Sequence, residues 1–253
     1  MCTDKQKQRL KLDALILDQV AETINQVPYM TSSPFLVDSR VMAQCTQEME
    51  DWDDACWDLV TRSVSSSSSE IDTGRGTRTG TGTYVPTGEH LYEAYWRALI
   101  FDTDPEQRGQ RASPGLKDAY EAWVSSFATS NEITRLKLSQ PNPPTPEYQQ
   151  QLIGVSLRLG IQSQAGYPFE TAFQQYTAGR KFFATKRGYI GWVSVATRPG
   201  DFVCYLEGNP LPFVIRRWEM QGYKLVGDCY LHGLMRGPER EGEGIGVKKI
   251  VLF

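Results

Sequence analysis

The feature that most constrains the fold of this chain is a change in hydrophobic period near Gly179. Before Gly179, apolar residues recur every three or four positions, as on a helix, whereas after it they recur every second position, as on a strand. Turn signals such as KRG, RPG and EGNP separate the strand-like segments. These segments are 181–185, 189–193, 201–206, 212–216, 223–231 and 247–253. Because no helical pattern lies between them, they predict an antiparallel meander or a small barrel.

Residues 1–178 are predicted to be mainly helical. Residues 9–16 alternate in hydrophobicity, which favours a strand, and we expect this strand to lead into a short helix that ends near residue 26. Apolar stripes then predict helices over 38–63, 88–102, 115–129, 146–159 and 168–178. The predicted fold class is therefore α+β, with an N-terminal strand and several helices packed on a C-terminal antiparallel β meander or small barrel.

Two segments are predicted to be mobile linkers. Residues 64–86 are rich in serine, glycine and threonine, and they cannot bury enough apolar area to offset the entropy of ordering. Residues 139–145 are rich in proline. We expect a helical region over 1–178 and a β module over 179–253, which together form one compact unit.

Charge and composition narrow the class of partner. The net charge of −3 combines −8 over residues 1–130, from 12 basic and 20 acidic residues, with +5 over 131–253, from 15 and 10. Because no basic block exceeds two adjacent residues, nucleic acid is not a favoured partner. No window approaches the roughly 18 apolar residues of a membrane helix. Five scattered cysteines favour reduced thiols in the cytoplasm or nucleus.

Two motifs offer chemistry but lack the residues that would complete it. The acidic cluster Asp51, Asp53, Asp54 and Asp58 lacks the glycine and glutamate spacing of a calcium loop, so we expect a solvated helix face. The run GRGTRTGTGT follows no strand and ends in no G-K-[ST], so it does not predict a phosphate site.

The cysteines of the β module are predicted to fill the core. Cys204 and Cys229 alternate with their neighbours so that they lie among phenylalanine and leucine, where a thiol behaves as a small hydrophobe. Cys229 and His232 lie on opposite faces of one strand, which disfavours a nucleophilic pair. The segment CYLH supplies only two zinc ligands of the four required. We therefore predict no catalytic residue, no metal site and no cofactor.

A polar row of Asp228, Tyr230 and His232 leaves two interpretations open. It lies opposite the face that carries Tyr223, Leu225, Gly227, Cys229 and Leu231. The row either hydrogen-bonds beneath covering helices, as a structural element, or lines a cleft in an enzyme that binds a nucleotide-like ligand. A pocket that opens to solvent and contains all three side chains would favour the enzyme.

The hairpin formed by 201–206 and 212–216 predicts one specific contact. Asp201 and Arg216 lie near facing ends of its two strands, so we expect a cross-strand ion pair. Glycines at the turns have a conformational explanation: Gly188, Gly200 and Gly222 supply positive φ, and Gly233 lets the chain leave its strand sharply.

Three consecutive segments resemble the C-terminal region of fungal heterokaryon incompatibility proteins. They read AGRKFFATKRGYIGW, RPGDFVCYLEGNPLPFVIRR and GYKLVGDCYLHGLMRG. The earlier segment EHLYEAYWRALIFD resembles the helix of that family that contains Trp-Arg-[TA]-Leu. The likeness extends over most of the chain, from about residue 9 to residue 253, and departs from the family pattern at Trp192, at Pro210 and after Met235.

The resemblance implies a non-enzymatic regulatory or recognition module that acts in nonself recognition after hyphal fusion. It also implies protein partners in the cytoplasm, and no membrane. Nothing here matches the family's cell-death-triggering domain, which resembles TIR domains. Positions that match the family motifs are expected to be mostly structural. They are Trp96, Arg97, Gly179, Arg180, Phe182, Gly188, Gly191, Gly200, Asp201, Cys204, Pro212, Arg216, Gly227, Cys229, Tyr230, His232 and Gly233.

Overall fold

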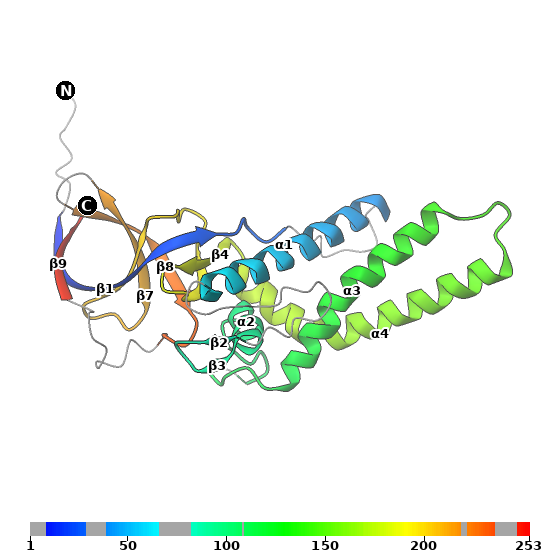
Figure 1. The fold of residues 1–253 in the computed structure, drawn as a ribbon, viewed down its shortest axis with the longest axis horizontal. Coiled ribbons are helices and arrows are strands. Elements are labelled where there is room, and N and C mark those ends of the chain that lie inside the picture. Colours follow the sequence, from blue (N-terminus) through cyan, green and yellow to red (C-terminus); the bar gives the residue numbers. More distant parts are fainter. Residues whose placement is uncertain (1–8, 29–38, 66–81, 108, 219–221, 236–246) are drawn as a thin grey trace, which may run out of the picture. The chain divides into compact units, whose positions relative to one another are not determined.

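A computed structural model describes residues 9–28, 39–65, 82–107, 109–218, 222–235 and 247–253 (Figure 1). The described chain forms two compact units. The first unit contains residues from 1–26, 58–101 and 179–253, and the second contains residues from 27–57 and 102–178. Most of the linker expected at 64–86 lies outside the described residues. No helix in the described part is long and apolar enough to cross a membrane.

The second unit is built from helices. It contains α3 (Gly115–Leu138), α4 (Pro146–Thr177) and the first part of α1 (Ser39–Ser65). Thr145 caps α4 by accepting a hydrogen bond from the Tyr148 amide, and Pro146 occupies the first turn. The two helices predicted over 146–159 and 168–178 are in fact this single helix, which continues through Pro168.

Aromatic packing holds α4 in one piece. Phe169 and Phe173 are buried and lie 5.4 and 5.0 Å, between ring centroids, from Trp123 of α3. Burial of these rings offsets the hydrogen bond that Pro168 cannot donate. The acidic cluster of α1 is not a wholly solvated face, because Asp53 is fully buried and accepts a hydrogen bond from the Tyr120 hydroxyl.

The first unit contains seven strands of one sheet. The six predicted C-terminal segments are confirmed as strands. The N-terminal strand is longer than predicted, because its second half pairs with β4 instead of turning into a helix. The strands are β1 (Leu10–Thr23), β4 (Arg180–Thr185), β5 (Ile190–Ser194), β6 (Phe202–Leu206), β7 (Pro212–Trp218), β8 (Gly222–Leu231) and β9 (Val247–Leu252).

The sheet closes on itself in two ways. Its strand order is β4-β5-β8-β7-β6-β1-β9, and further pairings join β4 to β1 and β8 to β9. All pairings are antiparallel except the short parallel contact of β8 with β9. The two long strands, β1 and β8, belong to both closures, so the predicted small barrel is confirmed and the α+β class with it.

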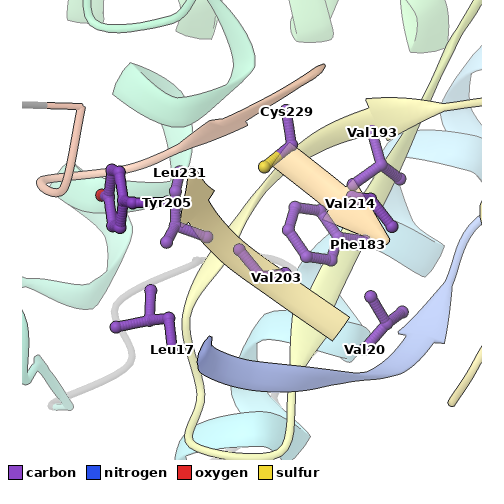
Figure 2. Close-up of a cluster of buried hydrophobic side chains, with 9 residues drawn as sticks. All are labelled: Leu17, Val20, Phe183, Val193, Val203, Tyr205, Val214, Cys229 and Leu231. Carbon is purple, nitrogen blue, oxygen red and sulfur yellow. The ribbon is translucent and has the colours of Figure 1, made fainter. Parts of the chain in front are cut away.

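Two apolar clusters occupy the two faces of the shared strands. One contains Leu17, Val20, Phe183, Val193, Val203, Tyr205, Val214, Cys229 and Leu231 (Figure 2). The other contains Ala14, Cys204, Ile215 and Ile250. The pairing of β7 with β8 shifts register between Val214 and Ile215, where Leu225 and Gly227 face consecutive residues. This bulge moves Tyr223 and Cys229 to different clusters, so the predicted continuous face from 223 to 231 is wrong.

A helix and a short hairpin lie against the β4-β5-β8 part of the first unit. They are α2 (Leu91–Leu99) and the hairpin of β2 (Thr83–Tyr84) with β3 (Glu89–His90). The indole N–H of Trp192 donates to the carbonyl of Ala98, and the ring of Phe182 meets that of Tyr95 edge to face. Tyr84 is fully buried, although it falls at the end of the segment predicted to be a linker.

Candidate functional site

The candidate site is a buried hydrogen-bond network around His232. The imidazole is completely buried, and the side chain of Tyr230 is nearly so. The Tyr230 hydroxyl lies 2.9 Å from Nδ1 of His232, and Oε2 of Glu89 lies 2.9 Å from Nε2. The imidazole thus bridges β8 and the β2–β3 hairpin.

One arrangement of protons on the His232 ring satisfies every group in this network. The Glu89 carboxylate only accepts, so Nε2 carries the proton and Nδ1 accepts from Tyr230. The Tyr84 hydroxyl donates to the His232 carbonyl and accepts from the Ile190 amide. Burial raises the pKa of Tyr84, so this phenol stays protonated. The network therefore joins the hairpin to β5 and β8.

Asp228 does not share this environment. Its side chain is about half exposed and pairs with Arg180 at 2.6 Å. The guanidinium carbon of Arg180 also lies 5.7 Å from the ring centroid of Phe101, which is itself 4.5 Å from the ring of Tyr230. Two members of the predicted row are therefore buried, whereas the third forms a surface ion pair.

The thiols have the character of core residues. Cys204 and Cys229 are both buried, in separate clusters. Burial raises the pKa of the Cys204 thiol to about 12 and also raises the pKa of the Cys229 thiol, so both are protonated near neutral pH. A protonated, buried thiol is a poor nucleophile.

The predicted ion pair between Asp201 and Arg216 is present. Nε of Arg216 lies 2.7 Å from Oδ1 of Asp201, and one terminal nitrogen lies 2.8 Å from Oδ2. Hydrogen bonding to Asp201 raises the pKa of Arg216. Asp201 also accepts from the Arg198 amide, so the pair fixes the turn that enters β6.

The remaining motif residues hold the backbone in place. Gly179, Gly188, Gly200 and Gly233 have positive φ, which favours glycine. Gly222 does not have a positive φ; it lies in β8, where a Cβ would meet the Phe253 ring at 2.0 Å, so the predicted turn role is wrong.

Close approach explains other motif glycines. At Gly191 a Cβ would lie 1.9 Å from the Tyr230 carbonyl oxygen, and at Gly227 it would lie 3.0 Å from Cβ of Ser194. Pro212 is the first residue of β7, a position at which strands tolerate proline.

Trp96 and Arg97, both in α2, share one hydrogen-bond partner on the same helix. The Trp96 indole N–H and Nε of Arg97 each lie 2.9 Å from a carboxylate oxygen of Glu93. Phe182 of β4 is buried, and its ring packs edge to face against the rings of Trp192 and Tyr95.

Sequence reasoning missed Glu89, Tyr84 and Phe101, which surround the predicted row. Glu89 and Tyr84 lie more than 100 positions from His232, and no local pattern links them to it. Phe101 could have been suspected only after its backbone was known, because it adopts a φ of 58°, unusual for a residue other than glycine.

In the part of the chain that the structure describes, neither a metal-binding cluster nor the pocket described below involves the residues around His232. Over the described residues, no group of three or more His, Cys, Asp and Glu side chains is arranged to hold a metal ion. A pocket of about 320 Å³ lies in the second unit, near Asp104 and the start of α3. None of the motif residues lines it.

Comparisons with known proteins agree with the motifs. A family model described as the Het-6 beta-barrel domain matches residues 81–243. Heterokaryon incompatibility protein 6, OR allele, of Neurospora crassa is 32% identical over 66 residues, which cover 25% of this chain and 10% of that protein. The chain thus matches about a tenth of the length of this relative. No solved structure gives a significant match.

Proposed function

This chain belongs to the Het-6 beta-barrel domain family, and from that premise we propose that it is a non-enzymatic recognition module in fungal heterokaryon incompatibility. In this proposal the chain acts in the cytoplasm, binds protein partners, and contributes to nonself recognition and to the control of cell death. The partial likeness to heterokaryon incompatibility protein 6 supports the process, although it covers a small share of that protein.

The observation that carries the non-enzymatic part is that each side chain of the polar row already has a partner within the protein. His232 has both ring nitrogens engaged, by Tyr230 and by Glu89, and it is completely buried. Catalytic groups need access to a substrate and a free hydrogen-bonding position. The hydrogen bonds of this network join groups within the β2–β3 hairpin, β5, β8 and His232, which directly follows β8. This arrangement is expected of a structural scaffold.

The test separates chemistry from folding at Tyr230. The chain is expressed in pairs of Neurospora crassa strains that form heterokaryons, and growth and viability are scored. Tyr230→Phe removes one hydroxyl from the network, and we expect it to keep the incompatibility phenotype while losing about 1 kcal/mol of stability, because one hydrogen bond is lost. Tyr223→Phe is the matched control, since it removes a phenolic hydroxyl from the same strand.

The opposite result would favour the enzyme. If Tyr230→Phe abolishes the phenotype while its melting temperature equals that of Tyr223→Phe, the hydroxyl takes part in chemistry or ligand binding. If the unmodified chain changes neither growth nor viability in any strain pair, the proposed role in incompatibility is wrong.

A further inference from the structure

Helix α4 carries apolar side chains on two opposite faces. One face is buried and includes Val155, Phe169 and Phe173, and α3 runs beside the helix (Figure 1). On the other face Ile153, Leu157 and Ile161 are 61%, 65% and 71% exposed. A helix on the surface of a soluble domain normally has one apolar face, so a second one indicates that another surface covers it.

The exposed face also lacks charge. All of α4 contains three charged residues, Glu147, Arg158 and Glu170, and Arg158 pairs with Glu132 of α3. Spacings of three and four place seven exposed residues on one side of the helix, which we call the Leu157 stripe. They are Gln150, Ile153, Gly154, Leu157, Gly160, Ile161 and Gln164.

The Leu157 stripe has the same residues on both sides of its centre. Counting away from Leu157, the stripe has a glycine three residues away, an isoleucine four away and a glutamine seven away, in both directions. When two such helices cross antiparallel about a two-fold axis at Leu157, position 157 + k of one meets position 157 − k of the other. Isoleucine then meets isoleucine, glycine meets glycine, and glutamine meets glutamine.

The glycines of the stripe need an explanation that their own helix does not supply. A Cβ at Gly154 or at Gly160 would have no atom within 4 Å, so α3 does not require glycine there. Each glycine costs an exposed helix interior about 1 kcal/mol relative to alanine. Close approach of a second backbone is a physical reason to keep glycine at both positions.

We propose that the Leu157 stripe is a self-association surface, on which α4 of one copy packs antiparallel against α4 of a second copy of this chain. From Gln150 to Gln164 the stripe extends about 21 Å along the helix, at 1.5 Å per residue. A contact of this length lies at the small end of specific interfaces, so the dimer dissociates with a Kd on the order of micromolar.

The first experiment measures oligomeric state by sedimentation over a range of concentrations. The chain shifts from monomer to dimer as the concentration rises. Leu157→Glu abolishes the dimer, because the two-fold axis brings the two glutamates together. Ser163→Glu adds the same charge on an exposed position of α4 outside the stripe, and it dimerises as the unmodified chain does. Circular dichroism verifies that both variants keep their helix.

The second experiment tests the two-fold symmetry itself. Leu157→Lys alone is monomeric, like Leu157→Glu, but an equimolar mixture of the two forms a heterodimer, because each glutamate now meets a lysine. An unmodified chain that stays monomeric at several hundred micromolar overturns the proposal, as does a dimer that Leu157→Glu leaves intact. A mixture that fails to pair, or a partner other than this chain on the stripe, overturns the two-fold contact.

Discussion

Asp201 is a nearly fully buried carboxylate that depends on a single guanidinium. The register of β6 and β7 places Phe202 opposite Ile215, so the next pair outward is Asp201 and Arg216. The two side chains therefore meet without distortion, and the contact is bidentate. The sequence predicted this contact because a short turn between two clear strands leaves little freedom in the register.

Arg216→Gln is expected to lower the free energy of unfolding by about 2–3 kcal/mol. The substitution leaves the Asp201 carboxylate buried with the Arg198 amide as a remaining donor, and an uncompensated buried charge is costly. Arg217→Gln, at an exposed position of the same strand, should change stability by less than about 0.5 kcal/mol. Urea unfolding measures both, and equal losses would contradict the buried-charge argument.

The row of Asp228, Tyr230 and His232 shows that a residue pattern predicts the face of a strand but not the partners or the exposure of its side chains. Alternation along β8 correctly set Tyr230 and His232 on one face. It gave no information on Glu89, which completes the network from a hairpin far away in the sequence. Nor did it show that Asp228 would remain at the surface, because exposure at a strand position depends on what covers it, and α2 with the β2–β3 hairpin covers only part of the strand.

At the scale of the elements, the positions of the strands and helices were predicted better than their lengths. Period and turn residues located all six C-terminal strands. The bulge in β8 was not predicted, since Leu225, Val226 and Gly227 fit continuous alternation equally well. Two helices were predicted over 146–159 and 168–178 where one exists, because the packing of Phe169 and Phe173 on α3 is a tertiary effect that a local pattern does not contain.

Gly166→Ala is expected to separate α4 from α3 and to destabilise the second unit by about 2 kcal/mol or more. A Cβ at this position would lie 2.8 Å from the backbone nitrogen and Cα of Trp123, and neither backbone atom can move without shifting a helix. Gly154→Ala on the same helix meets no atom and should stabilise the monomer by up to about 1 kcal/mol. Thermal unfolding at a concentration well below the micromolar Kd of the proposed dimer compares them, and equal melting temperatures would refute the close contact.

At the scale of the whole molecule, the sheet depends on a strand from the other end of the chain. The first 23 residues supply β1, which pairs with β4, with β6 and with β9. The sequence predicted a β module over 179–253 and, separately, an N-terminal strand. It could not predict that this strand completes both closures, because pairing between distant segments leaves no local pattern.

Removal of residues 1–26 is therefore expected to unfold the first unit. Without β1, three strands lose a neighbour, and Leu17 and Val20 leave the cluster they share with Phe183. Removal of residues 1–8 alone is the control, because it shortens the chain and keeps all of β1 with its pairings. Dispersed methyl signals in the NMR spectrum report the folded cluster.

A synthetic peptide spanning residues 9–26 should restore the fold when it is added to the truncated chain. The peptide supplies the missing backbone hydrogen bonds to β4, β6 and β9 and returns the apolar side chains to the cluster. A second peptide in which Leu17 and Val20 are replaced by aspartate should fail, because burial of two carboxylates costs more than the pairing returns. Methyl signals that stay dispersed in the truncated chain alone would mean that residues 27–253 close the sheet without β1.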